Sequence, residues 1–345
     1  MARPGPGGDT VTMKTIATEL GVSVTTVARA LKDGHKVGPE LVARVRDTAD
    51  RLGYVRNLEG AKLRTGRTLV AMAFLSFTEQ EEIGDSGSIG LLQGIHKWFA
   101  GTDYSVRAVP VAMGDLALEQ VREVVRGRNA DGLILDHTQL LDDRVKYLLE
   151  ADFPFITFGR TELLSPHAFF DVDNEYAAWQ STDALLRDGY RRVALVDGDL
   201  RYSFVRQRLR GYETALREHG IDPDPALYHH DELRADRTRQ AAAGLINAGA
   251  DAFVCVNELS FLGVRAGVRD RMGPDVERYG FALRSGTNLA DYVATRVYTS
   301  HFSNQQAGRR LAELLLKRIE GAPPGDCQEL VKTTLRINGT PQDGV

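Results

Sequence analysis

Cysteine is nearly absent from this sequence of 345 residues, which contains only Cys255 and Cys327. Two cysteines supply neither a disulfide framework nor a cluster of metal ligands, and such sparse usage fits the reducing cytoplasm. No apolar run approaches the roughly 18 residues that a membrane-spanning helix needs. The first ten residues, MARPGPGGDT, also lack the apolar core of a secretory signal. We therefore expect a cytoplasmic protein with no metal, no cofactor and no membrane segment.

Charge is distributed unevenly along the chain. Residues 1–67 contain twelve Lys and Arg against seven Asp and Glu, a formal charge of +5, whereas the remainder carries −9 of the total of −4. A basic region on an otherwise acidic protein favours contact with a polyanion, with chance variation as the alternative explanation. The length exceeds what one compact core usually holds, so we also expect more than one domain.

Three short helical patterns occupy residues 11–56. The first ends at Gly21, a typical residue after a helix C-terminus, and Ser23 can cap the second. The third begins near Pro39, at a position where proline is tolerated. We therefore predict an all-α head, preceded by a disordered tail rich in Gly and Pro over residues 1–10.

The second of these helices has two contrasting faces. At roughly 100° per residue, Thr25, Arg29 and Lys32 share one arc, opposite an apolar arc that can pack on the first helix. A helix-turn-helix unit places its second helix in the DNA major groove, where Arg29 can pair with guanine and Val24 can touch a thymine methyl group. A merely solvated polar face is the alternative. The candidate DNA-binding residues are Val24, Thr25, Arg29 and Lys32 in the major groove, and Thr12, Ser23 and Thr26 on phosphate oxygens.

Beyond residue 68 the pattern changes to short apolar strands that alternate with helices, which is typical of parallel sheets in α/β layers. The alternation restarts after a break near 160–175, so we predict two similar lobes with a ligand cleft at the carboxyl ends of the strands. The segment ELVKTTLRI (329–337) is predicted to be a closing strand. The expected limits are about 68–168 and 299–325 for lobe 1, and about 169–298 and 326–340 for lobe 2, within a body spanning 68–345.

The segment VTMKTIATELGVSVTTVARAL, followed by a valine, the third helix and LGYVRN, resembles the DNA-binding head of LacI-family transcription regulators. In that family, two residues after the serine and an arginine farther along read bases, and the resemblance gives these roles to Val24, Thr25 and Arg29. The chain departs from the family pattern at Ala28, Lys32 and Arg56, where Ser, Asn and Pro are usual. These changes preserve the groove-facing arc, but they mean that the DNA sequence of each operator half-site does not follow from the resemblance.

The same resemblance makes residues 57–67 the family's hinge helix or linker, which becomes helical when two protomers sit on DNA. A helix this short is marginal alone in water, and Gly60 lowers its propensity further. Leu63 lies where the family places a leucine that wedges into a base step from the minor groove. A flexible linker is the alternative. The candidate hinge and minor-groove residues are Asn57, Lys62, Leu63 and Arg64.

The rest of the chain resembles, more loosely, the family's periplasmic-binding-protein-like effector domain, through segments such as DGYRRVALVDGD (188–199) and VCVNE (254–258). By position, Arg208 matches an arginine that holds hydroxyl or carboxylate groups of an effector. Asn257 matches a polar residue at a strand end, and Arg160 is expected to face the same cleft. An arginine fork with an amide suits a polyol or a sugar acid.

One departure from the family concerns the effector. Where the family commonly has aspartates at the cleft, this chain reads YGFALRS, so Ala282 and Leu283 replace the acids. The aspartate clamp for sugar hydroxyls is therefore absent at these positions. We expect a sugar or glycoside as the effector, with a larger glycoside or a ligand other than a sugar as alternatives.

Together these features predict an all-α helix-turn-helix head followed by a two-lobed, periplasmic-binding-protein-like body with parallel sheets. We interpret the chain as a homodimeric, sequence-specific repressor of transcription whose affinity for operator DNA a small-molecule effector controls. An α/β enzyme that handles sugars is the second hypothesis, but the sequence has no P-loop and no nucleophile elbow. Its His/Asp cluster, His229 to Asp231, is interpreted as a solvated turn. A transporter's solute-binding protein is the third, disfavoured by the absence of a signal peptide.

Overall fold

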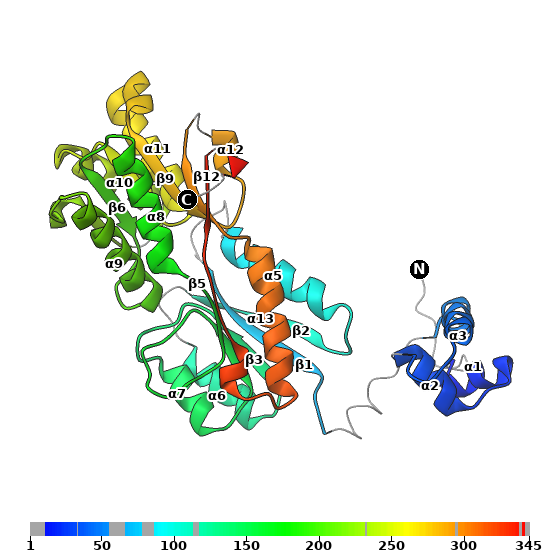
Figure 1. Ribbon diagram of the computed structural model, residues 1–345. Coiled ribbons are helices and arrows are strands. Elements are labelled where there is room, and N and C mark those ends of the chain that lie inside the picture. Colours follow the sequence, from blue (N-terminus) through cyan, green and yellow to red (C-terminus); the bar gives the residue numbers. More distant parts are fainter. Residues whose placement is uncertain are drawn as a thin grey trace, which may run out of the picture. The chain divides into compact units, whose positions relative to one another are not determined.

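The computed structural model divides the chain into two compact units, residues 1–67 and residues 68–345 (Figure 1). The predicted tail and the predicted hinge residues Asn57, Lys62, Leu63 and Arg64 lie outside the described residues, so what we expect of them stays a prediction. No helix in the described part of the chain is long and apolar enough to cross a membrane. The structure describes residues 11–32, 34–54, 66–77, 86–112, 117–231, 233–293, 296–337 and 340–341.

The amino-terminal unit contains three helices, α1 (Met13–Leu20), α2 (Val24–Lys32) and α3 (Pro39–Leu52), as the sequence predicts. The hydroxyl of Thr12 caps α1 by accepting a hydrogen bond of 3.3 Å from the backbone N–H of Thr15. Gly21 follows α1 with a left-handed φ of 65°, which closes the helix and turns the chain into α2. The small core between the helices consists of Ile16, Ala17, Val27, Ala30, Val45 and Ala49.

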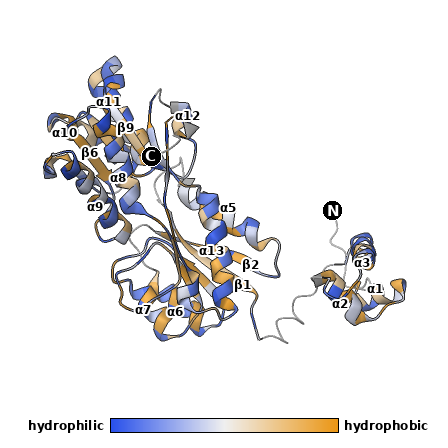
Figure 2. Cartoon of the chain, viewed as in Figure 1, coloured by the Kyte–Doolittle hydropathy of each residue, from blue (hydrophilic) through white to orange (hydrophobic). Residues whose placement is uncertain are grey.

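The first lobe of the body is a parallel sheet in the order β11-β5-β4-β3-β1-β2. Its strands are β1 (Val70–Phe77), β2 (Ser105–Ala112), β3 (Gly132–Leu135), β4 (Phe155–Phe158), β5 (Phe169–Val172) and β11 (Gln328–Val331). Helices α5 (Ser86–Phe99) and α13 (Asn304–Ile319) cover one face, and α6 (Leu118–Arg126) and α7 (Asp143–Glu150) cover the other. Because both faces are covered, the central strands β1, β3 and β4 are mostly hydrophobic along their length, whereas the edge strand β11 is not (Figure 2).

The second lobe also has helices on both faces of a sheet, here in the order β13-β12-β10-β9-β8-β6-β7, in which β12 pairs antiparallel with β10 and β13 and the other pairings are parallel. Helices α8 (Asn174–Arg187) and α9 (Ser203–Glu218) cover one face, and α10 (Ala235–Asn247) and α11 (Glu258–Met272) cover the other. The short helix α12 is Ala290–Val293, and single 3₁₀ turns occupy Pro225–Leu227, Gly273–Arg278 and Pro324–Cys327. The strands are β6 (Val193–Asp197), β7 (Tyr228–His230), β8 (Ala252–Cys255), β9 (Gly280–Ser285), β10 (Tyr298–His301), β12 (Thr334–Ile337) and β13 (Thr340–Pro341).

The structure corrects two predictions about this body. The expected strand over 329–337 is two strands in different sheets, because the chain crosses between the lobes at 332–333. Strands β5 and β11 therefore belong to the first sheet and β10 to the second, which shifts the predicted lobe limits by a few residues. The predicted turn at His229 is also wrong, since β7 pairs in parallel with β6.

The lobes are joined by three crossings and by contacts across the cleft mouth. The crossings follow β5, β10 and β11, and the side chain of Gln180 accepts hydrogen bonds from Ser300 (3.2 Å) and Thr333 (3.1 Å) at two of them. At the mouth, the carbonyl oxygen of Thr138 in lobe 1 accepts a hydrogen bond of 3.1 Å from the backbone N–H of Ser203 in lobe 2. The two lobes are thus held close together, with the carboxyl ends of their strands facing one cleft.

Candidate functional site

The first candidate site is the exposed face of α2 in the amino-terminal unit. Val27 and Ala30 are buried in the small core, whereas Val24, Thr25 and Arg29 are exposed, Val24 to 43%. The guanidinium of Arg29 makes no hydrogen bond or ion pair with any group in the described part of the chain. The side chain of Lys32 lies outside the described residues. This face therefore presents a free guanidinium beside a hydroxyl and a methyl-bearing side chain, the groups that read base edges.

Three hydroxyl groups that we assign to phosphate contacts also shape the two helices. Thr12 caps α1, and the hydroxyl of Ser23 accepts a hydrogen bond of 3.1 Å from the backbone N–H of Thr26 at the start of α2. The Ser23 and Thr26 hydroxyls lie 2.8 Å apart. A hydroxyl has one donor and two acceptor positions, so the capping bonds still leave capacity for a phosphate oxygen. Their contact with DNA stays a prediction.

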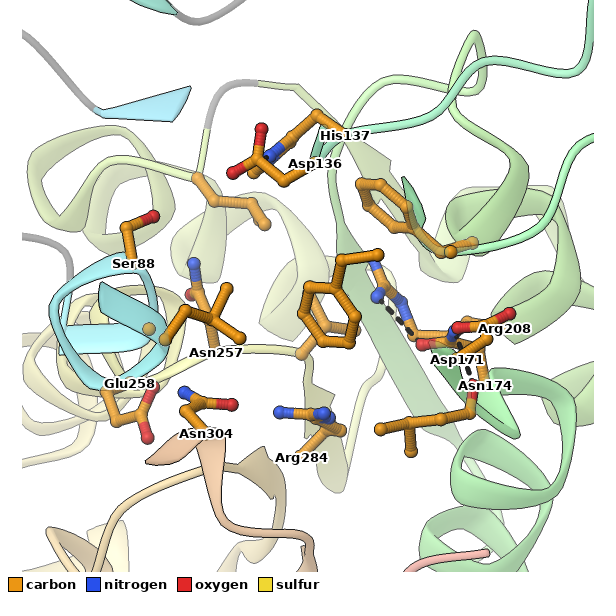
Figure 3. A pocket seen from close by; sticks show the side chains of 18 residues that line it. Ser88, Asp136, His137, Asp171, Asn174, Arg208, Asn257, Glu258, Arg284 and Asn304 are labelled. Carbon is orange, nitrogen blue, oxygen red and sulfur yellow. Dashed lines mark hydrogen bonds and ion pairs between the residues drawn. The ribbon is translucent and has the colours of Figure 1, made fainter. Parts of the chain in front are cut away.

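The second candidate site is a cavity of about 170 Å³ between the two lobes of the body (Figure 3). Part of its wall comes from residues at or just after the ends of strands, including Asp136 after β3, Asp171 in β5, Asn257 after β8 and Arg284 in β9. The carboxyl ends of parallel strands are where ligands of such folds bind. The volume lies below the roughly 300–1,000 Å³ of drug-sized ligand pockets, so the cavity suits a compact ligand.

Arg208 lines this cavity, as predicted, but two of its three guanidinium nitrogens already donate to the carboxylate of Asp197. Its side chain is 8% exposed, and its Nε donates to Asp197 Oδ2 at 2.7 Å while Nη2 donates to Oδ1 at 2.5 Å. The remaining nitrogen, Nη1, makes a long bond of 3.4 Å to Asn174 Oδ1, and the guanidinium lies over the ring of Phe204. Arg208 can therefore offer a ligand only its Nη1 edge, because the buried carboxylate holds the rest.

Asn257 also lines the cavity, and it has a second role as the N-cap of α11. Its Oδ1 accepts a hydrogen bond of 2.8 Å from the backbone N–H of Ser260. The cap fixes the orientation of the side-chain amide, whose nitrogen makes no hydrogen bond with the described residues. The amide nitrogen is thus a donor held ready for a ligand.

The structure corrects the expected position of Arg160, which is absent from the cavity wall. Its Nε instead donates to Asp171 Oδ2 at 2.8 Å, and its Nη2 lies 3.4 Å from Gln207 Oε1. The strand β4 ends at Phe158, and Gly159, with a positive φ of 110°, turns the chain so that the side chain of Arg160 reaches the carboxylate of Asp171. Arg160 therefore positions a cavity residue and does not face the ligand space.

The sequence analysis did not predict several charged or polar residues of the cavity, among them Asp136, Asp171, Glu258 and Arg284. Burial raises the pKa of Asp171 to about 6, although Arg160 opposes the shift. Burial also lowers the pKa of Arg284 to about 10, so this side chain stays protonated at neutral pH. Although burial opposes ionisation of Asp136, the neighbouring His137 and the backbone N–H of Ser76 lower its pKa. The signal that points to these residues is a charged side chain directly at the carboxyl end of an apolar strand.

The two units together define a class of protein: a helix-turn-helix head with an exposed polar face on its second helix, joined to a two-lobed body with a cavity between its lobes. Residues 12–57 match the family described as bacterial regulatory proteins, lacI family. Residues 85–335 match the family described as periplasmic binding proteins and sugar binding domain of LacI family. The chain belongs to the LacI family of DNA-binding transcriptional regulators.

Individual relatives agree with this assignment. The chain is similar to the transcriptional regulator RafR of Escherichia coli, with 34% identity over 219 residues that cover 63% of this chain and 64% of RafR. It is also similar to the regulator AglR of Rhizobium meliloti, with 26% identity over 96% of this chain and 94% of AglR. The chain spans less than two thirds of RafR and nearly all of AglR.

Solved structures show the same fold. The chain is similar to the regulator CelR in its complex with cellobiose, with a TM-score of 0.71 and 22% sequence identity. The match covers 97% of this chain and 100% of the CelR chain. A lac repressor dimer bound to operator and an anti-inducer has a TM-score of 0.71 and 18% identity, over 96% and 99% of the two chains. At these identities the likeness establishes the architecture of head and body.

Proposed function

We propose that this regulator is a homodimeric repressor without enzymatic activity, which acts in the cytoplasm and whose operator affinity is set by a sugar or glycoside bound between its lobes. The observation that carries the proposal is that one chain combines an exposed face on α2, suited to reading bases, with a separate body whose lobes form a cavity lined by charged and polar side chains among apolar ones. Ligand binding changes how tightly the lobes close, and closure changes the spacing of the two connectors in a dimer. The effector thereby shifts the population that is competent to bind DNA.

The domain assignment is part of the proposal: residues 11–56 read DNA, 57–67 act as the hinge, and 68–345 bind effector and dimerise. A sugar is supported as effector by the family description of residues 85–335 and by the cellobiose complex of CelR, a structural relative. The charges around the cavity favour a neutral ligand, because the carboxylate of Asp171 is paired with Arg160, and the cavity residue Arg208 is paired with the buried carboxylate of Asp197.

A gel-shift experiment tests this function directly. The purified full-length protein is titrated onto the promoter next to its own gene at several salt concentrations, with and without a panel of mono- and disaccharides. We expect selective retention of the promoter over random duplex, and a change in affinity with at least one sugar. A protein that does not discriminate any genomic fragment from random duplex under these conditions contradicts the proposal.

Replacing Arg29 by alanine is expected to weaken operator binding by about 1–3 kcal/mol and to relax the preference at one base pair. The reason is the exposed guanidinium on the polar side of α2, which no other described residue engages. Binding-site selection with wild-type protein and variant measures both effects. An unchanged affinity and an unchanged base preference would show that this face does not enter the groove.

Effector affinity is expected to fall as the pH drops from about 7 to about 5. Asp171 has a pKa of about 6, so its ionised fraction falls about tenfold over this range. A ligand hydroxyl that donates to Asp171 binds the ionised form more tightly than the protonated form, because the carboxylate is the stronger acceptor, so affinity should fall as the pH falls through the pKa. Calorimetric titrations at both pH values should show a loss of up to about tenfold.

The charged neighbours of Asp171 are Arg160 and Arg284, and the pKa of Arg284, about 10, lies well above this range. His137 in the same cavity is the other group to consider. Asp171→Asn serves as the control, because it should remove the pH dependence between 5 and 7. A dependence that persists in this variant assigns the titration to His137 and refutes the role given to Asp171.

A further inference from the structure

An arginine without a partner stands in the wall of the interlobe cavity. Arg284 lies near the end of β9, two residues after Ala282, and lines the cavity. No group in the described ranges hydrogen-bonds or forms an ion pair with its guanidinium. The other arginine of the wall, Arg208, is held by a carboxylate on two of its nitrogens. Arg284 thus has all five N–H donors available to a ligand.

Two further polar side chains lie on the same side of the cavity, where the guanidinium of Arg284 points toward the amide of Asn304 (Figure 3). Asn304 is 6% exposed, and its side-chain amide has no hydrogen-bond partner among the described residues. Glu258, 7% exposed, accepts hydrogen bonds at Oε1 from Ser285 (2.6 Å) and Thr287 (2.7 Å). Its Oε2 has no such partner in the described part of the chain, and Glu258 forms no ion pair with Arg284.

This leaves one free cation and one free carboxylate oxygen on a shared wall, with an amide beside them. Buried polar groups are costly unless they are hydrogen-bonded, so a ligand that satisfies this wall gains binding energy from it. A carboxylate ligand would satisfy Arg284 but would bring a second negative charge close to Glu258. Two adjacent hydroxyl groups satisfy both, because each hydroxyl can accept and donate at once.

We propose that Arg284, Asn304 and Glu258 form the specificity-determining wall of the cavity, which binds adjacent hydroxyl groups of a neutral saccharide. One hydroxyl accepts from Arg284, its neighbour donates to Glu258, and the amide of Asn304 bonds to either. Ala282 and Leu283 have no side-chain acceptor for sugar hydroxyls. In this proposal Arg284, farther along the same strand, and Glu258, at the start of α11, bind the hydroxyls instead. This inference rests on the proposed function, in which the cavity holds the effector.

The test uses the full-length protein and a panel of neutral mono- and disaccharides with their uronic-acid counterparts, measured by titration calorimetry. We expect neutral sugars to bind, and Arg284→Gln and Glu258→Gln each to weaken the best of them by about tenfold or more, the loss of a hydrogen bond to a charged group. Arg239→Gln is the matched control. Arg239 lies on the surface in an exposed ion pair with Asp270, and its loss should leave sugar affinity unchanged.

Deoxy sugars separate a ligand contact from a structural effect. A deoxy analogue that lacks the hydroxyl held by Arg284 should bind wild-type protein about tenfold more weakly, yet bind Arg284→Gln as well as the parent sugar does. The thermal unfolding midpoint and DNA binding without sugar verify that each variant is folded. If Glu258→Gln unfolds, the comparison of wild type and Arg284→Gln, each with the parent sugar and the deoxy sugar, decides the outcome.

The results distinguish this inference from the function on which it rests. Sugar binding that is indifferent to both Arg284→Gln and Glu258→Gln overturns the role of the wall and leaves the sugar-controlled regulator intact. Binding of uronic acids in preference to neutral sugars overturns the inference, because an anion would then be the partner of Arg284. Failure of every saccharide to bind overturns the inference together with the proposed effector class.

Discussion

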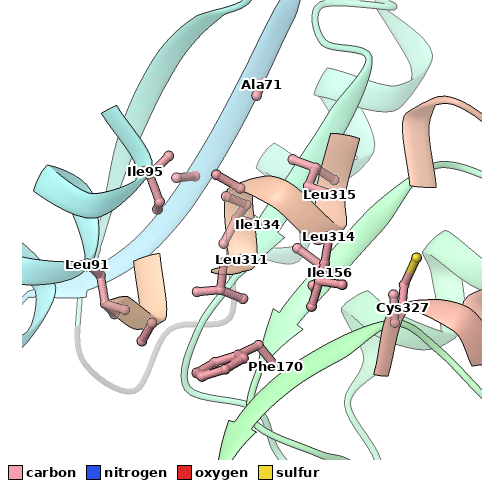
Figure 4. Close-up of a cluster of buried hydrophobic side chains, with 14 of the residues drawn as sticks. Ala71, Leu91, Ile95, Ile134, Ile156, Phe170, Leu311, Leu314, Leu315 and Cys327 are labelled. Carbon is pink, nitrogen blue, oxygen red and sulfur yellow. The ribbon is translucent and has the colours of Figure 1, made fainter. Parts of the chain in front are cut away.

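Removing residues 1–66 is expected to abolish sequence-selective DNA binding while leaving sugar binding by the body intact. The body has hydrophobic cores of its own, such as the cluster of Leu91, Ile95, Phe170 and Leu311 between α5, α13 and the first sheet (Figure 4). The core of the amino-terminal unit shares no residue with them. Because each unit has a hydrophobic core of its own, the loss of one should not unfold the other.

Gel shifts and calorimetry on the truncated protein measure the two activities side by side. The formal charge of residues 1–67 is +5 and that of the rest is −9, so the truncated body should also lose its nonspecific affinity for DNA. Retention of full operator affinity by the truncated body would overturn the assignment of DNA reading to α2. Loss of sugar binding would show that the effector site needs the amino-terminal unit.

Arg208→Met is expected to destabilise the body by about 3–5 kcal/mol, because it leaves the fully buried carboxylate of Asp197 without its cation. The change also removes the Nη1 donor and the contact with Phe204 from the cavity wall, so sugar affinity should fall in the fraction that remains folded. Chemical denaturation monitored by circular dichroism measures the first effect, and calorimetry the second.

Two variants separate these effects. Arg239→Met breaks an exposed pair with Asp270 and should cost no more than about 1 kcal/mol. The double variant Arg208→Met, Asp197→Leu should recover much of the lost stability, since no buried charge is left unpaired, but it should not recover sugar affinity. If Arg208→Met has the same free energy of unfolding as wild type, the prediction is wrong, and burial of the Asp197 carboxylate does not require pairing with this arginine.

Local sequence was sufficient to predict the amino-terminal unit. Periodicity places Val27 and Ala30 on the opposite side of α2 from Thr25 and Arg29, and the structure buries the first two and exposes the others. Gly21 marks the turn between the helices, where its left-handed φ is needed. In a unit of three short helices the core is made of near neighbours, so a helical period and two caps suffice to predict its exposed face.

The effector cavity depended on contacts that no local pattern encodes. Arg208 and Asn257 were predicted by position, but Arg160 turned to the back of Asp171, and the unpaired Arg284 was not singled out at all. The strand expected over 329–337 divides between two sheets because the chain crosses the lobes there. Alternating strands and helices predict parallel layers, but which strand ends meet across a cleft depends on pairings between distant parts of the chain, such as that of β5 with β11.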